Sequence, residues 1–125
     1  MQLAGVERQL REARDSLEES LAHARADAFD PAYRAALRSR NLLFHATRGL
    51  AAARGNELPE MPVVAGAPGG LDDATAAIAA LDGALAIIAP EPALPALDDA
   101  IAAARPPYAR WLGFLREAVA RSLRR

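Results

Sequence analysis

Apolar residues recur at alternating spacings of three and four between positions 3 and 24, with charged residues between them. This repeat is typical of an α-helix that buries one stripe of its surface. The stripe consists of Leu3, Val6, Leu10, Ala13, Leu17, Leu21 and Ala24. The sequence therefore predicts a long N-terminal helix that packs through a single face.

Asp30 and Pro31 mark the expected start of a second helix. An Asp at the N-cap accepts hydrogen bonds from exposed backbone N–H groups, and Pro is tolerated at the first helical position. Gly55 is expected to end this helix in a left-handed conformation. So short a connection predicts an antiparallel hairpin over residues 1–54. The apolar stripe expected on the second helix contains Tyr33, Leu37, Leu43, Phe44, Leu50 and Ala51.

Residues 55–71 show neither helical nor strand periodicity, and Pro and Gly are interspersed with apolar side chains. They are predicted to form a long loop. Loops of this length are uncommon in compact domains unless they are functional or mobile. The apolar side chains, including Val63 and Val64, predict that the loop lies over the bundle or meets a partner.

Residues 72–124 are predicted to form the remaining helices. The third helix is expected to begin at Asp72 or Asp73, with Asp82 and Gly83 as its weak point, and to end before Pro90. Its expected buried stripe is Ala74, Ile78, Leu81, Leu85 and Ile88. A short helix follows through Leu97 and Ile101, and Pro106 and Pro107 break the chain before a last helix. That helix is expected to pack through Tyr108, Trp111, Leu112, Leu115, Val119 and Leu123.

Together these segments predict an all-α fold, an antiparallel bundle of four to five helices that forms one domain over residues 1–125. Hydrophobic residues make up 52% of the chain, but no apolar run approaches the roughly 20 residues that span a bilayer. The N-terminus has no signal-peptide pattern. Cys is absent, which excludes disulfides, thiol nucleophiles and Cys-based metal sites, and fits a cytoplasmic location.

Charge is segregated along the chain although the net charge is only −1. Residues 56–104 contain eight acidic residues and no basic ones, whereas residues 105–125 contain six Arg and one acid, Glu117. We expect the last helix to lie against the acidic middle of its own fold. The alternative is a basic surface that binds nucleic acid or an acidic partner.

The segment around His45 resembles the phosphoacceptor signature of histidine-phosphotransfer domains, in which His is followed three residues later by Lys or Arg and then directly by Gly. Here the matching residues are His45, Arg48 and Gly49. The resemblance implies that His45 carries the phosphoryl group, that Arg48 stabilises its charge and that Gly49 leaves room for the partner. Helical geometry places His45 and Gly49 nearly opposite the apolar stripe. Thr47 and Arg54 stand where that family usually has hydrophobic residues.

The same segment is also similar to the Arg-Asn-x-x-x-His motif of HEPN domains, many of which are metal-independent RNases. The matching residues are Arg40, Asn41 and His45. This resemblance implies that Arg40 contacts phosphate, that Asn41 supplies a polar neighbour and that His45 performs acid–base chemistry. Helical geometry separates Arg40 from His45, so a shared site needs a helix kink or a second subunit.

A structural explanation accounts for both motifs without chemistry. In it, Arg40 reaches across the hairpin to Glu18 or Glu19, and the other polar residues of the motifs are solvated. Gly49 then serves close helix packing. Two His without a local group of acids make a metal site unexpected. No Gly-rich phosphate loop or nucleophile motif is present, so no cofactor is expected.

The last helix carries two aromatic residues, Trp111 and Phe114, that cannot both face the centre of the core. Aromatic residues beside Arg are favoured interface anchors, and with Val63 and Val64 they form the expected interface. Because no catalytic set of residues is complete, we expect a protein-interaction or adaptor domain. It is expected to self-associate through an Ala-rich face, since small side chains let helices approach closely. The phosphotransfer and RNase functions are the alternatives.

Overall fold

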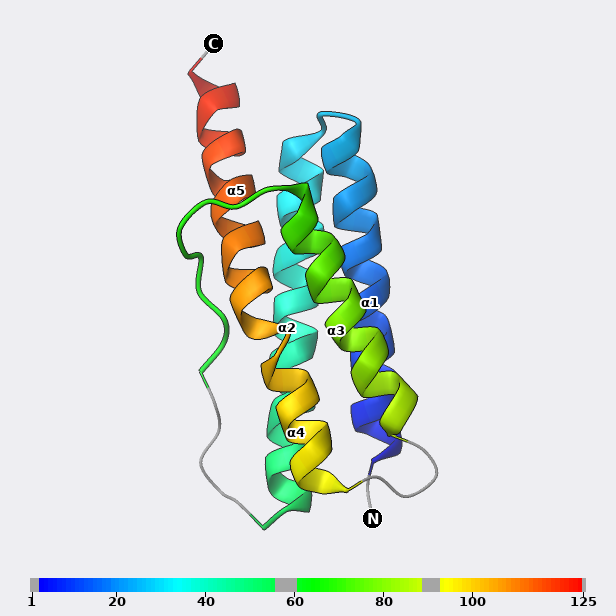
Figure 1. Cartoon of the computed structure of the whole chain (residues 1–125). Coiled ribbons are helices and arrows are strands. Elements are labelled where there is room, and N and C mark those ends of the chain that lie inside the picture. Colours follow the sequence, from blue (N-terminus) through cyan, green and yellow to red (C-terminus); the bar gives the residue numbers. More distant parts are fainter. Residues whose placement is uncertain (1–2, 56–60, 89–92, 125) are drawn as a thin grey trace.

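A computed structural model describes residues 3–55, 61–88 and 93–124. Within these residues the chain forms five α-helices and no strands, which confirms the all-α prediction. They are α1 (Ala4–Arg25), α2 (Phe29–Ala53), α3 (Leu71–Ile87), α4 (Leu94–Ala102) and α5 (Arg105–Leu123) (Figure 1). Because α4 and α5 follow one another along the same side of the molecule, the five helices build a four-helix bundle.

Neighbouring helices of the bundle are antiparallel. α1 and α5 each contact both α2 and α3, and α4 also contacts α2 and α3. In Figure 1, α1, α4 and α5 run in one direction, whereas α2 and α3 run in the other. Two consecutive helices that run in the same direction need a connection as long as the bundle. The long loop between α2 and α3 is this crossover.

The crossover lies along α5. The Gly66 N–H donates to the carbonyl of Ala109 over 2.9 Å, and the Gly69 N–H donates to that of Arg110 over 3.0 Å. A side chain at Gly113 would overlap the Gly66 carbonyl, so glycine is required where the loop crosses the helix. The prediction that the loop lies over the bundle is therefore confirmed for residues 61–70. Residues 56–60 of the predicted loop, and the predicted helix end at Pro90, lie outside the described residues.

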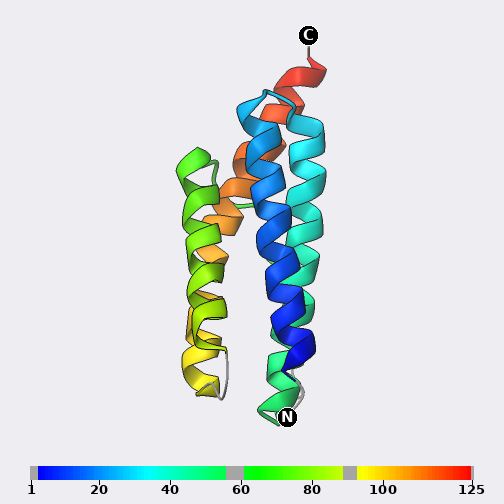
Figure 2. The same ribbon diagram turned by 90° about the vertical axis from the view of Figure 1, so that its right-hand side faces the viewer.

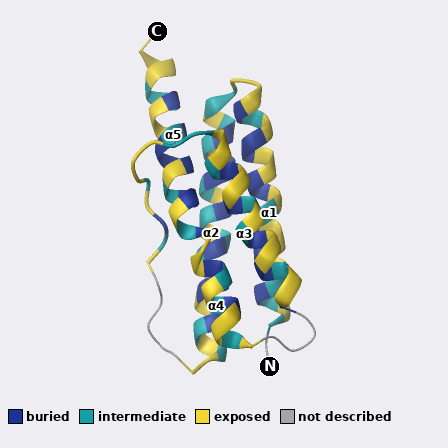
Figure 3. Ribbon diagram, in the orientation of Figure 1, coloured by how far each residue is buried: buried dark blue, intermediate teal, exposed yellow. Residues whose placement is uncertain are grey.

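The predicted stripe of α1 forms the centre of the core, with every member buried except the half-buried Leu3 (Figure 3). The buried stripe of α2 differs from the predicted one. Tyr33, Leu37 and Phe44 lie half-buried at the edge, and small residues take their place inside the bundle. The buried residues of α2 are Ala32, Ala35, Ala36, Ser39, Leu43, Ala46, Thr47 and Leu50. Small side chains at these positions bring the α2 backbone close to its neighbours.

α3 shows the same preference for small inward-facing residues. Its buried residues within the helix are Ala74, Ala77, Leu81 and Ala84. The predicted stripe members Ile78 and Leu85 are only half-buried at its edge. Asp82 and Gly83, the predicted weak point, are both helical and exposed, so α3 continues through them without interruption.

The turn between α1 and α2 differs from the prediction. α2 begins at Phe29, and Asp30 lies in its first turn rather than at the N-cap. The Asp30 carboxylate forms an ion pair with Arg34, one turn further along α2. Asp27 reverses the chain in the left-handed region, with a φ of 59°. Asp tolerates this conformation better than most residues, which explains why no Gly is needed here.

Two buried hydrogen-bonded chains fasten α5 to the α1–α2 hairpin. Trp111 Nε1 donates to Ser20 Oγ over 3.0 Å, and Ser20 donates to the Ala32 carbonyl over 2.7 Å. The Tyr108 hydroxyl lies 2.6 Å from Ser39 Oγ, which donates to an α1 carbonyl oxygen over 2.6 Å. Because the single Ser39 proton goes to that carbonyl, Tyr108 must donate to Ser39.

Burial raises the pKa of Tyr108 well above its usual value, and the hydrogen bond with Ser39 offsets only part of that effect. Tyr108 therefore stays protonated and keeps its role as a donor. Each chain links three helices, so the two serines fix how α5 sits on the hairpin. In the part of the chain that the structure describes, no helix has both the length and the apolar composition needed to cross a membrane.

Candidate functional site

The phosphotransfer-like residues lie in the C-terminal half of α2. His45 and Arg48 are both exposed and occupy neighbouring positions one turn apart. The Arg48 guanidinium lies 5.8 Å from the centroid of the Phe44 ring, and the His45 ring lies 5.9 Å from the same ring. His45 is therefore accessible to a phosphoryl donor, but Arg48 packs on Phe44 rather than on the imidazole.

Gly49 does not lie on the exposed side with His45, contrary to the prediction. A Cβ at Gly49 would approach Val6 Cγ2 of α1 to 2.9 Å, which is closer than real contacts allow. Thr47 is also buried, and its hydroxyl donates to the Leu43 carbonyl over 2.9 Å. The expectation that Gly49 serves close helix packing is confirmed. Gly49 therefore leaves no room for a docking partner, because α1 fills the space beside it.

The HEPN-like residues are not assembled within one chain. Arg40 donates to the Asn41 side-chain oxygen over 3.2 Å. Five residues of helix separate Arg40 from His45 by about 140° around the axis. The expectation that Arg40 binds Glu18 or Glu19 was wrong, because Arg38 makes the ion pair with Glu19. Arg38 lies two residues closer than Arg40 to the α1–α2 turn and on another side of α2, where it reaches Glu19.

Among the described residues, the acidic middle of the chain forms ion pairs with the first hairpin as well as with the last helix. Arg14 of α1 forms an ion pair with Asp82. Arg54, at the end of α2, forms one with Asp98 over 2.7 Å. Both arginines belong to the N-terminal 55 residues, so the expected pairing with α5 holds only in part.

Within the described residues, α5 also forms an ion pair with the acidic middle. Arg110 Nε donates to Asp73 over 2.7 Å, and the other Asp73 oxygen accepts from the Gly70 N–H over 2.9 Å. Burial raises the pKa of Asp73, but these two donors outweigh burial, so the pKa lies below its usual value. The Asp73 carboxylate thus caps the start of α3 and ties it to α5.

The remaining arginines of the second half of α5 have no such partner. Arg116, Arg121 and Arg124 are exposed and form no ion pair with any described residue. All four residues from Arg121 to Arg124 are exposed. In Figures 1 and 2 this end of α5 projects beyond the start of α3 and beyond the α1–α2 turn. The positive end of the chain therefore points away from the acidic residues.

Two of the four expected interface residues belong to the core. Trp111 and Val63 are 0% and 4% exposed, so neither can anchor a partner in this conformation. Phe114 is half-buried, stacked on Trp111 with the ring centroids 5.3 Å apart and edge-on to Phe29 at 6.3 Å. Val64 is 71% exposed on the crossover. Trp111 is buried because its indole N–H finds Ser20 inside the bundle.

The solvent side of α3 carries mostly small apolar residues after an acidic start, and no described part of the chain covers it. We define the α3 face as the exposed residues that recur along it at helical spacing, which are Asp72, Ala76, Ala79, Gly83 and Ala86. A Cβ at Gly83 would meet no atom within 4 Å. The sequence signal for this surface is that small apolar residues recur on both sides of α3, whereas the predicted stripe covers one side only.

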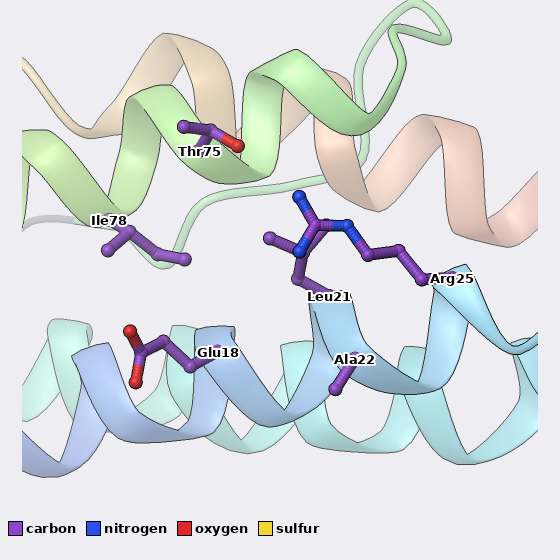
Figure 4. A pocket seen from close by; sticks show the side chains of 6 residues that line it. All are labelled: Glu18, Leu21, Ala22, Arg25, Thr75 and Ile78. Atoms are coloured by element: carbon purple, nitrogen blue, oxygen red, sulfur yellow. The ribbon is translucent and has the colours of Figure 1, made fainter.

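Two open hollows flank the α3 face along its seam with α1. The first, of about 350 Å³, is lined by Glu18, Leu21, Ala22, Arg25, Thr75 and Ile78. Figure 4 shows Arg25 extending over Leu21 toward α3, with Glu18 at the opposite end. The second is lined by Arg11, Arg14, Asp15, Asp82, Leu85 and Ala86. Neither hollow is enclosed, and among the described residues no group of three or more His, Cys or acidic side chains is placed to hold a metal.

Comparison of the chain with models of protein families, with curated protein sequences and with solved structures finds no match.

Proposed function

We propose that this chain is a protein-interaction domain that self-associates through the α3 face. The observation that carries the proposal is that the solvent side of α3 exposes a row of small apolar residues in addition to the apolar residues on its core side. The row consists of Ala76, Ala79, Gly83 and Ala86. A row of apolar residues along a second side of a helix normally packs against a second neighbour. Exposed apolar surface of this kind is characteristic of interaction sites.

Gly83 supports a helix as the partner. Gly in a helix interior costs about 1 kcal/mol relative to Ala. No described part of this chain requires glycine there, because a Cβ at Gly83 would meet no described atom within 4 Å. Close approach of a second helix explains why a side chain is absent.

The electrostatics of the α3 face are compatible with a second copy. Asp72 lies at the start of the face, away from its centre. Asp82 lies at the edge of the face, and its charge is compensated by Arg14. The central part of the face, from Ala76 to Gly83, presents only small neutral side chains. Two identical faces can therefore meet without bringing like charges together at their centre, as a twofold-symmetric interface requires.

Sedimentation velocity across a concentration series tests this function. The wild-type chain is expected to shift from monomer to dimer as concentration rises. Ala79→Arg places a charged side chain at the centre of the face and is expected to keep the chain monomeric. Ala52→Arg is the matched control, because Ala52 is exposed on α2. A wild-type chain that stays monomeric throughout the series, or equal effects of both variants, contradicts the proposal.

Phosphotransfer through His45 is a second candidate function. The observation in its favour is an exposed imidazole on a helix of a four-helix bundle, with Arg48 one turn away. Incubation with a phosphorylated response regulator or an autophosphorylating kinase should then give an acid-labile, alkali-stable label that His45→Gln abolishes. Failure to transfer across a broad kinase panel argues against it. Metal-independent RNA cleavage lost in both Arg40→Ala and His45→Ala would instead favour an RNase built from two copies.

A further inference from the structure

The last turns of α5 carry positive charge that no described carboxylate neutralises. The three arginines of residues 116–124 form no ion pair with any described residue, and Glu117 is the one acid in this stretch of sequence. Elsewhere in the bundle, Arg14, Arg54 and Arg110 are each matched by a carboxylate. A C-terminal cation favours the helix dipole within the last turn only, so the dipole does not account for Arg116.

The geometry of this helix end suits a groove rather than a flat surface. At 100° per residue, Arg116 and Arg121 lie about 140° apart around the helix, and Arg124 lies between them. A flat acidic protein surface could meet only part of such an arc. Two phosphate rows on either side of an inserted helix could meet all of it.

The projecting end is also free to enter a groove. Residues 121–124 are exposed on every side, and Leu123 is 80% exposed. Figures 1 and 2 show the end standing clear of the other helices in both views. A helix with its side chains is about 10–12 Å across, and the major groove of B-form DNA is about 12 Å wide.

We propose that the C-terminal end of α5 binds duplex DNA, with its helix in the major groove and Arg116, Arg121 and Arg124 on the phosphates of the two strands. Guanidinium groups match phosphate oxygens in paired hydrogen bonds. The contacts are to the backbone and carry no sequence preference. An A-form RNA duplex has a major groove that side chains cannot reach, so it is not a ligand of this kind.

Fluorescence anisotropy with a labelled mixed-sequence DNA duplex tests this proposal across a salt series. Three phosphate contacts predict a slope of about −2.7 in a plot of log K against log salt. Arg121→Gln is expected to weaken binding for every duplex sequence and to reduce the magnitude of the slope by about 0.9. Arg11→Gln is the matched control, because Arg11 is exposed but paired with Glu7. Circular dichroism confirms that both variants remain folded.

Three results would overturn the proposal. The first is no salt-dependent binding of the DNA duplex at low salt. The second is an equal loss of affinity in Arg11→Gln, which would assign the binding to general charge. The third is equal or tighter binding to an RNA duplex of the same sequence or to vesicles containing phosphatidylserine. Each result leaves the self-association of α3 untouched, since that is measured without a ligand.

Discussion

The hydrogen-bonded chain through Ser39 makes a quantitative prediction about stability. In Ser39→Ala, the Tyr108 hydroxyl loses its acceptor while it remains 0% exposed. An orphaned buried hydroxyl costs about 1–3 kcal/mol. The carbonyl of Ala13 also loses the Ser39 donor, but it remains paired within α1, so that loss adds little. Ser39→Ala is therefore expected to lower the free energy of unfolding by about 2 kcal/mol.

Tyr108→Phe removes the same hydrogen bond from the other end. Ser39 still donates to the Ala13 carbonyl in this variant, so no donor is orphaned. The expected loss is the net value of one hydrogen bond, about 0.5–1.5 kcal/mol. In the double variant neither partner is left unsatisfied, so its loss should be smaller than the sum of the two single losses by about 1 kcal/mol.

Urea unfolding followed by far-UV circular dichroism measures these three free energies. The experiment is run at one fixed protein concentration, because self-association stabilises the folded state by mass action. Two results would show that the buried hydrogen-bonded chain between α5 and the hairpin does not exist as described. One is a free energy of unfolding for Ser39→Ala that equals the wild-type value within experimental error. The other is a loss in the double variant that equals the sum of the two single losses.

Four further variants test the packing of the bundle and its response to pH. Gly49→Ala should destabilise by about 1–3 kcal/mol in chemical denaturation because its methyl group meets Val6, whereas Gly83→Ala should stabilise the monomer by about 0.5–1 kcal/mol. Leu17→Ala should cost about 2–5 kcal/mol by the same assay, since Leu17 is 0% exposed. The lowered pKa of Asp73 means that its ion pair stabilises the fold above the unfolded pKa, and that this stability is lost as pH falls through the folded pKa. Asp73→Asn should therefore show a shallower loss of melting temperature with acidification below about pH 4.

Large apolar residues at regular spacing were enough to predict α1, because its stripe of Leu and Val alternates with charged residues. The same reasoning was partly wrong about which residues of α2 and α3 are buried. There the inward positions are Ala and Ser, and larger residues such as Phe44 and Leu85 lie at the edges. Hydrophobicity alone ranks Phe above Ala, but close backbone packing reverses that order when the neighbouring helix leaves little space.

The buried polar residues could not be identified from the sequence. In the sequence, Ser20 and Ser39 look like surface residues. They are buried because Trp111 and Tyr108, from a distant segment, form hydrogen bonds with them. The ion-pair partners of the acidic middle could not be predicted from the charge pattern either, because they depend on which helices the fold brings side by side. The crossover between α2 and α3 brings α3 beside α1. Asp82 therefore forms its ion pair with Arg14 rather than with an arginine of the last helix.

Cross-linking through an introduced cysteine tests the central claim, that two copies meet through the α3 face. The chain contains no Cys, so Ala79→Cys carries a single thiol at the centre of the face. A disulfide requires the two Cα atoms to lie within about 7 Å, which only a direct meeting of the two faces provides. Under mild oxidation, Ala79→Cys is expected to give a covalent dimer, whereas Ala52→Cys on the exposed side of α2 remains monomeric. Equal dimer yields from both variants, or none from Ala79→Cys, would contradict the account.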